Sequence, residues 1–281
     1  MGRIFIIIAV LLGSASIGYA DDALTRNEQR TINFAFATRL GSGIYDVDGR
    51  TVQIYRIPIA FTLMQENERG VGVKLMLPLT FGFVDFKPTD VLGGELPESL
   101  DTTSFMPGVE VRVRVRANWH LVPFAEAGRA VERTGVASAW IFTGGLRSLV
   151  EWQPGNFDIQ LGNELAVTYA NPSGNAAHDY FSDFETAVEA RHGLGVAPQG
   201  HELDLGAYLV ADLYLNDTLF PLHAEKEDSG HSFETGLTFG TRKPAKLWKI
   251  PIPRIGIGYR FGPEISVFRI VLGIAAPSLE R

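Results

Sequence analysis

The chain has 281 residues, a net charge of −7 and no cysteine, and this length suits one large domain or two small ones. The acidic balance and the lack of a basic tract argue against nucleic acid as a partner. The absence of cysteine excludes a disulfide framework and a thiolate metal site.

The N-terminus has the pattern of a secretory signal peptide. Arg3 provides a short positive region, residues 4–12 form an apolar run, and small residues follow. The apolar run is shorter than the roughly 20 residues that a spanning helix needs, so a cleaved signal is favoured over a membrane anchor. We expect a signal peptide over residues 1–20, a short periplasmic N-terminal segment over 21–28, and one folded domain over 29–281.

The most regular pattern in the chain is G-V-E-V-R-V-R-V-R-A at residues 108–117. Valines alternate with charged residues, so a β-strand would place all valines on one face and all charges on the other. In a soluble sheet the charged face meets water, whereas in a membrane barrel the valines face lipid and the charges face the lumen. The other strands must decide between these two folds.

Further segments with the same alternation bring the total to about twelve strands of roughly ten residues, with no convincing helix between them. The expected strands are 29–40, 51–64, 70–83, 108–117, 121–129, 138–152, 157–170, 183–192, 202–215, 232–241, 254–261 and 265–274. An even number of strands of this length is typical of bacterial outer-membrane barrels. The sequence therefore predicts an all-β fold, an antiparallel transmembrane β-barrel of about 12 strands.

The links between strands support this prediction. Long polar links, such as 41–50 and 85–106, mostly follow the odd-numbered strands, whereas short turns follow the second, fourth and sixth. Outer-membrane barrels have long extracellular loops and short periplasmic turns, so we expect both termini in the periplasm. The links 242–253 and 262–264 break the alternation.

Two prolines fall inside expected strands. Pro58 and Pro78 have no N–H to give to a neighbouring strand, and a closed barrel has no edge that would tolerate this loss. We therefore expect β-bulges at both positions.

The inward faces of the expected strands are rich in charge. Strands one to four, eleven and twelve carry mostly basic residues, and strands five to ten mostly acidic ones, which predicts either a field across the lumen or ion pairs that close it. The arginines within 112–116 are expected to face Glu164, Glu185 and Glu189. Twelve strands lie between filled and open barrels, and a charge-packed interior is favoured over a selective pore. The expected lumen-lining charges are Arg39, Arg56, Lys74, Glu110, Arg112, Arg114, Arg116, Glu126, Arg147, Glu151, Asp158, Glu164, Glu185, Glu189, Arg191, Asp204, Asp212, Glu234, Arg254 and Arg260.

Candidate catalytic and metal-binding groups are sparse. His231 and Ser232 are adjacent, so a strand points them to opposite faces, and neither G-x-S-x-G nor H-E-x-x-H occurs. Residues 46–49 begin like a calcium loop, but an ordinary turn is favoured. The acidic loop residues Glu225, Glu227 and Asp228, with His223 and His231, could hold a divalent cation or bridge lipopolysaccharide, although a solvated loop is the better interpretation. We expect no enzymatic activity, no cofactor and no metal.

The complete pattern resembles the translocator barrels of autotransporters, which also have about twelve strands. It most resembles the solitary autotransporter-like outer-membrane barrels without a passenger. The resemblance rests on the last two strands, I-G-I-G-Y-R-F at 255–261 and the segment 265–274. Two features depart from the family: residues 275–281 follow the last strand, and residues 21–30 are too short for a passenger.

The resemblance implies an integral outer-membrane protein of a Gram-negative envelope, with a structural or porin-like small-solute role. Its implied partners are outer-membrane lipid and lipopolysaccharide, periplasmic chaperones and the barrel-assembly machinery. Three alternatives remain open. They are a soluble exported β-sandwich or lipocalin-like binding protein, a lipid-modifying outer-membrane enzyme, and a surface adhesin or receptor that acts through loops 85–106, 171–182 and 216–230.

Overall fold

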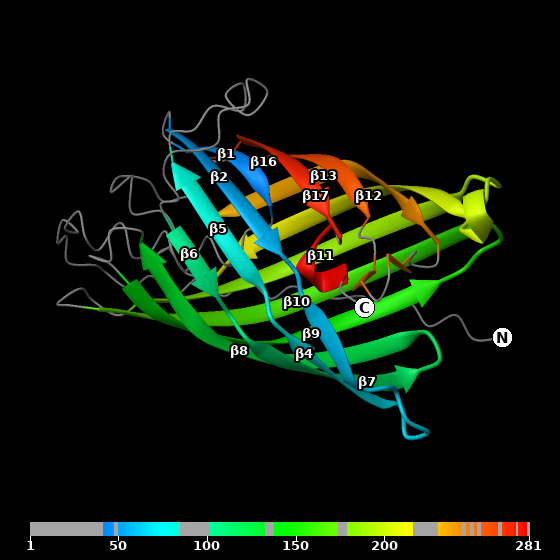
Figure 1. The fold of residues 1–281 in the computed structure, drawn as a ribbon, viewed down its shortest axis with the longest axis horizontal. Coiled ribbons are helices and arrows are strands. Elements are labelled where there is room, and N and C mark those ends of the chain that lie inside the picture. The colour runs from blue at the N-terminus through cyan, green and yellow to red at the C-terminus, as the bar shows by residue number, and fades with distance from the viewer. Residues whose placement is uncertain are drawn as a thin grey trace.

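The computed structural model shows that most described residues lie in strands of one antiparallel sheet (Figure 1). It describes residues 42–47, 50–84, 102–132, 138–173, 179–215, 230–242, 246–247, 250–251, 254–263, 266–273 and 275–279. The strands are β1 (Gly43–Val47), β2 (Arg50–Ile57), β3 (Ala60–Met64), β4 (Val71–Met76), β5 (Leu79–Val84), β6 (Thr102–Phe105), β7 (Gly108–Arg116), β8 (Trp119–Glu132), β9 (Ser138–Trp152), β10 (Phe157–Pro172), β11 (Asp179–Gly193), β12 (Leu203–Tyr214), β13 (His231–Thr241), β14 (Lys246–Leu247), β15 (Ile250–Pro251), β16 (Ile255–Phe261) and β17 (Ser266–Leu272), with short 3₁₀ helices η1 (Pro198–Gly200) and η3 (Pro277–Leu279).

The sheet closes on itself. Each strand pairs with the next around the order β8-β6-β5-β2-β1-β17-β16-β13-β12-β11-β10-β9, and β9 pairs again with β8. Strands β3, β4 and β7 continue β2, β5 and β6 along the chain and pair with one another and with β8. The described strands therefore form a closed barrel with twelve positions around its wall, as the sequence predicts.

Prolines interrupt three neighbouring strands at one level of the wall. The chain breaks its pairing at Pro58 between β2 and β3, at Pro78 between β4 and β5, and at Pro107 between β6 and β7. Backbone hydrogen bonds continue across this seam, because the carbonyls of Pro78 and Pro107 accept from Met106 and Ala127 at 3.2 and 2.9 Å. The sequence predicted β-bulges within continuous strands at Pro58 and Pro78, but the structure has breaks between strands there, and Pro107 adds a third break.

Two sequence predictions about the first strands are wrong. The expected loop 41–50 contains strand β1, which pairs with both β2 and β17 and so closes the wall. The expected loop 85–106 contains β6, which fills the gap between β5 and β8. The expected first strand, 29–40, lies outside the described residues. The link 242–253, which is long where the sequence pattern calls for a short turn, contains the small β14–β15 pair.

The two faces of the wall have opposite chemistry. Outward side chains are large and apolar, and Leu209, Ile257 and Phe268 are 58%, 67% and 71% exposed. Inward side chains are polar or charged, and Glu164 and Gln160 are both 0% exposed. A water-soluble sheet would bury its apolar face instead. No helix among the described residues is long and apolar enough to cross a membrane.

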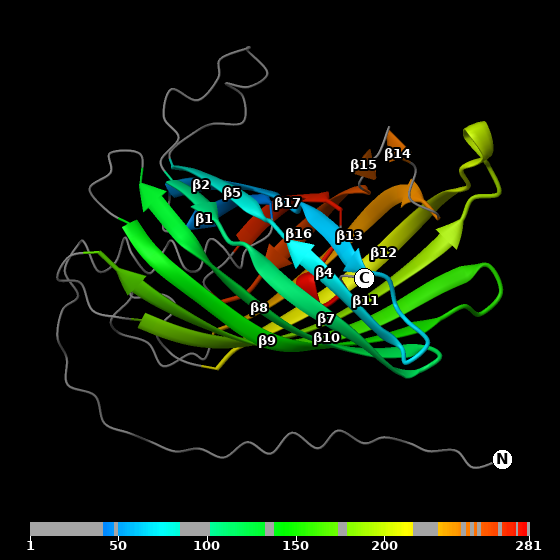
Figure 2. The same cartoon turned by 60° about the horizontal axis from the view of Figure 1, so that its bottom comes forward.

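The segment after the last strand lies inside the barrel. Figures 1 and 2 show η3, in red, enclosed by the strands in both views. Ala275, Ala276 and Leu279 are buried together with Leu149 of β9 and Ala187 of β11. We call residues 275–279 the luminal segment. Its burial was not anticipated from the sequence, where residues 275–281 only marked a departure from autotransporter barrels.

Candidate functional site: the closed lumen

The first group of buried charges centres on Arg147 of β9. Its Nη1 lies 3.2 Å from a carboxylate oxygen of Glu110, and its Nη2 lies 3.0 Å from Oε2 of Glu164. Lys74 Nζ is 2.9 Å from the other oxygen of Glu110. The guanidinium also stacks over the ring of Phe124, with 5.2 Å between Cζ and the ring centroid. Strands β4, β7, β9 and β10 are thereby joined by paired charges in a desolvated space.

A second group centres on Glu234 of β13. Its Oε2 accepts from Arg260 Nε at 2.9 Å and from Arg269 Nη1 at 2.6 Å, and its Oε1 accepts from the Tyr208 hydroxyl at 2.7 Å. The ring of Tyr208 reaches Glu234 by lying across Gly236 and Gly258, where any Cβ atom would clash with the ring. The two glycines are therefore required by the close approach of a neighbouring side chain.

A third group lies nearer the end of the barrel at which β11 ends and β12 begins. Glu189 of β11 is paired with Arg191 on its own strand and accepts from Thr238 Oγ1 at 2.7 Å. Arg254 lies 3.9 Å from the same carboxylate and also pairs with Asp204 of β12. Positive charge from the residue before β16 thus reaches across β13 to the acidic strands β11 and β12.

Three carboxylates stand side by side in one row of the wall. Glu164, Glu185 and Asp212 are direct cross-strand neighbours on β10, β11 and β12. The outer two have cationic partners, because Arg147 pairs with Glu164 and Arg260 with Asp212 at 3.1 Å. Within the described part of the chain, no Lys or Arg pairs with Glu185.

The luminal segment supplies the partner of Glu185. The backbone N–H of Ser278 donates to Glu185 Oε1 at 2.8 Å, and Ser278 is 0% exposed. The segment fits because β10 has Gly162 beneath it, where a Cβ atom would clash with the Ser278 carbonyl. A backbone donor, and not a cation, therefore meets the central carboxylate of the row.

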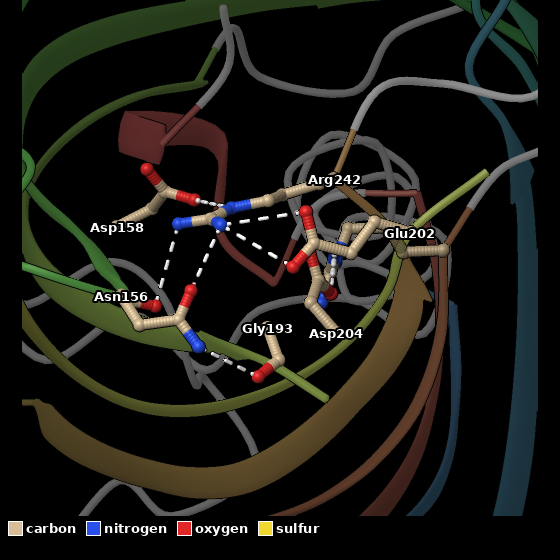
Figure 3. A network of polar contacts seen from close by, with 7 residues as sticks. Asn156, Asp158, Gly193, Glu202, Asp204 and Arg242 are labelled. Atoms are coloured by element: carbon tan, nitrogen blue, oxygen red, sulfur yellow. Dashed lines mark hydrogen bonds and ion pairs between the residues drawn. The ribbon is translucent and has the colours of Figure 1, made fainter. Parts of the chain in front are cut away.

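An arginine spans the turn end of the lumen (Figure 3). Arg242, just after β13, donates through Nε to Asp158 at 2.9 Å and through Nη1 to the Asn156 side-chain oxygen at 3.0 Å. Its Nη1 also lies 3.4 Å from Glu202. Asn156 in turn donates to the Gly193 carbonyl at 2.9 Å. One side chain thus connects the ends of β10, β11, β12 and β13.

The arginines of β7 lie at the same end of the barrel. Arg112 Nη2 is 3.4 Å from Glu151, and Arg114 Nε is 3.0 Å from Glu66 in the turn between β3 and β4. Arg116 is exposed at the end of β7. The sequence prediction that these arginines face Glu164, Glu185 and Glu189 across the lumen is wrong. Arg112 and Arg114 pair with Glu151 and Glu66, whereas Glu164 and Glu189 pair with Arg147 and Arg191.

The predicted charges are otherwise placed inside as their strand phase requires. Ten are buried, namely Glu110, Arg147, Asp158, Glu164, Glu185, Glu189, Asp204, Asp212, Glu234 and Arg260. Seven are partly exposed, namely Arg56, Lys74, Arg112, Glu126, Glu151, Arg191 and Arg254. Arg114 and Arg116 are exposed, and Arg39 lies outside the described residues. The sequence left open a field across the lumen or ion pairs that close it, and the structure shows ion pairs between nearby strands.

Sequence reasoning missed four contributors to the lumen: Arg269, Tyr208, Arg242 and Ser278. Arg269 was available from its phase on β17, where it alternates with outward Phe268 and Ile270. Tyr208 was available in the same way, since it shares its phase on β12 with Asp204 and Asp212. Arg242 and Ser278 lie outside the expected strands and carried no such signal. Ser232, considered as a nucleophile, is buried and donates to Asp212 at 3.1 Å. Most of the acidic loop 216–230 lies outside the described residues.

No family model matches the chain, and no curated protein sequence matches it. Among solved structures, it is similar to the β domain of the Bordetella autotransporter BrkA, with 11% sequence identity and a TM-score of 0.47. The similarity covers 82% of this chain and 91% of that chain.

Proposed function

We propose that this protein is an integral outer-membrane β-barrel with a closed, ion-paired lumen and no enzymatic activity. The observation that carries the proposal is the inverted wall, which is apolar outside and charged inside. Lipid is the solvent that such an outer face requires. In this proposal the protein is exported through its signal peptide and assembled with periplasmic chaperones and the barrel-assembly machinery.

The height of the apolar wall supports the membrane assignment. On β9, outward Trp140 and Trp152 are 52% and 44% exposed and mark the two ends of the apolar face. Twelve residues of strand separate them, which is roughly 40 Å along the strand and roughly 30 Å along the normal if the strand tilts by about 40°. Aromatic residues at both ends of an apolar band about this tall are typical of membrane barrels.

The filled lumen favours a structural barrel over an open porin. Inward residues at several levels, such as Gln160, Glu164 and Ser278, are out of reach of water. An aqueous channel would leave such residues hydrated. We therefore propose that the protein acts through the outer face of its wall and through its loops, and that solutes do not diffuse through the barrel.

Three measurements test the proposal. Cell fractionation should place the protein in the outer membrane, released by detergent but not by alkaline carbonate, and the folded form should migrate faster than the boiled form on a gel. Planar-bilayer recordings of the purified chain should show no stable open conductance. A protein soluble without detergent would refute the membrane assignment, and a steady ohmic current would refute the closed lumen.

A further inference from the structure

One outward position of the wall breaks the apolar rule. Among wall-strand residues with described side chains, Arg129 of β8 is the one charged side chain that faces outward away from the strand ends. Its guanidinium donates to Ser138 Oγ at 3.0 Å and lies 6.0 Å from the ring centroid of Trp140. A cation on a lipid-facing surface is costly unless an anion or the interface accommodates it.

The wall next to Arg129 is hollowed. A shallow apolar groove of 710 Å³ runs over β7 to β10. Its floor is formed by outward residues with little or no side chain, Ala125, Ala127 and Gly144. Exposed Phe142 and Val167 stand beside this floor. The hollow is therefore a product of small residues placed between large ones at neighbouring positions of the sheet.

The cation stands at one end of this groove. Arg129 is the next outward residue after Ala127 on β8, and Trp140 is the next after Phe142 on β9. Successive outward residues on a strand are about 7 Å apart. Beyond them lie hydroxyl groups, since the Oγ atoms of Ser138 and Ser173 are 3.0 Å apart. The apolar groove thus ends at the guanidinium of Arg129, the indole of Trp140 and the hydroxyls of Ser138 and Ser173.

We propose that this groove binds one phosphate-bearing lipid A molecule, with an acyl chain on the small residues and a phosphate at Arg129. The proposal rests on the outer-membrane assignment above. An arginine fork matches the geometry and charge of a phosphate. Lipid A is assigned over a phospholipid because Arg129 lies toward the β8–β9 link, the end that also carries the long links after β5 and β12. In outer-membrane barrels the long loops are extracellular.

The test measures lipid retention by native mass spectrometry of the full chain purified in detergent. Three probes are titrated: lipid A with both phosphates, dephosphorylated lipid A, and phosphatidylglycerol. The wild type should retain one lipid A molecule, and Arg129→Gln should weaken this binding by about tenfold, the effect of losing one charge-assisted contact. For dephosphorylated lipid A the two proteins should bind alike, because the substitution and the missing phosphate remove the same interaction.

A pair of matched variants tests the groove. Gly144→Leu should fill the floor without strain, since a Cβ there meets nothing nearer than the Phe124 carbonyl oxygen at 3.9 Å, and should reduce lipid A retention. Ala207→Leu places the same leucine side chain at an exposed outward position on β12 and should leave retention unchanged. Heat-modifiable migration shows that each variant is folded.

Several results would overturn the proposal. They are unchanged binding by Arg129→Gln, equal effects of the two leucine variants, or tighter retention of phosphatidylglycerol than of lipid A. If the protein fractionates with the outer membrane but retains no lipid A, this inference fails and the proposed function stands. If the protein is soluble, both fail.

Discussion

Arg147 and Glu185 occupy the same row of the lumen but have opposite electrostatic surroundings. Arg147 pairs with the buried carboxylates of Glu110 and Glu164, whereas Glu185 lies between the carboxylates of Glu164 and Asp212. We predict that Arg147→Met lowers the free energy of unfolding by about 3–5 kcal/mol, because it leaves buried charges unpaired. Glu185→Gln should be neutral or stabilising, since it relieves like-charge repulsion and its amide oxygen still accepts from Ser278. Urea unfolding in lipid vesicles measures both, and equal losses would contradict the assigned pairing.

The outer face allows a second prediction at the level of residues. Leu209 lies in the middle of β12 and is 58% exposed. Leu209→Arg should destabilise the protein by about 2–4 kcal/mol if that face meets the bilayer centre, while Leu203→Arg at the strand start should cost about 0–1 kcal/mol. The same unfolding assay applies to both. Similar tolerance at the two positions would indicate that water, not lipid, surrounds the wall.

The sequence revealed which residues point inward but not which of them pair. Alternation along a strand has a period of two, so the phase of Arg147 or Glu234 can be read directly. Their partners depend on the register between strands and on residues distant in the chain, such as Arg242 and Asp158. The sequence grouped the charges by halves of the wall and so allowed an electrostatic field across the lumen. In the structure the charges instead pair between nearby strands.

Among the strands, regular alternation decided how well boundaries could be predicted. The expected strand 138–152 coincides with β9, because Trp140, Phe142, Leu146, Val150 and Trp152 keep one phase along it and a Pro-Gly turn follows. Strands β1 and β6 were missed, since one has five residues that include Gly43 and Asp46 and the other has four residues. Both depend on their neighbours in the wall for hydrogen bonds, which no local pattern reveals.

The proline seam gives a prediction at the level of strands. Gly128 of β8 faces the break between β6 and β7, where a Cβ atom would clash with the Phe105 carbonyl and Met106 Cα. Gly128→Ala should therefore lower the free energy of unfolding by about 1–3 kcal/mol, the usual cost of overpacking. Gly144→Ala on β9, where a Cβ meets only ordinary contact, is the control. If Gly128→Ala costs no more unfolding free energy than Gly144→Ala, then the wall is not closely packed at the proline seam.

For the whole molecule, the sequence predicted a closed, charge-filled barrel of about twelve strands, and the structure has this fold. It did not predict that the chain returns into its own lumen after β17. The segment 275–279 is short, mostly apolar and without periodicity, so its sequence does not indicate that it lies in the lumen. Their place is set by a feature on another strand, the missing side chain of Gly162, together with a carboxylate on β11.

The luminal segment gives the last prediction, because it fills space that the ion pairs leave between β9, β10 and β11. Deleting residues 275–281 should remove the Ser278 donor from Glu185 and admit water along the row of carboxylates. We expect the truncated barrel to show brief, cation-selective openings in planar bilayers, since Glu164, Glu185 and Asp212 would line the opened path.

Gly162→Val should open the lumen by a second route, because its side chain displaces the Ser278 carbonyl without shortening the chain. Ser278→Ala retains the backbone N–H that donates to Glu185 and should stay closed like the parent. If both the deletion and Gly162→Val fold, as heat-modifiable migration would show, and neither conducts, then the ion pairs alone seal the barrel and the luminal segment is not its plug.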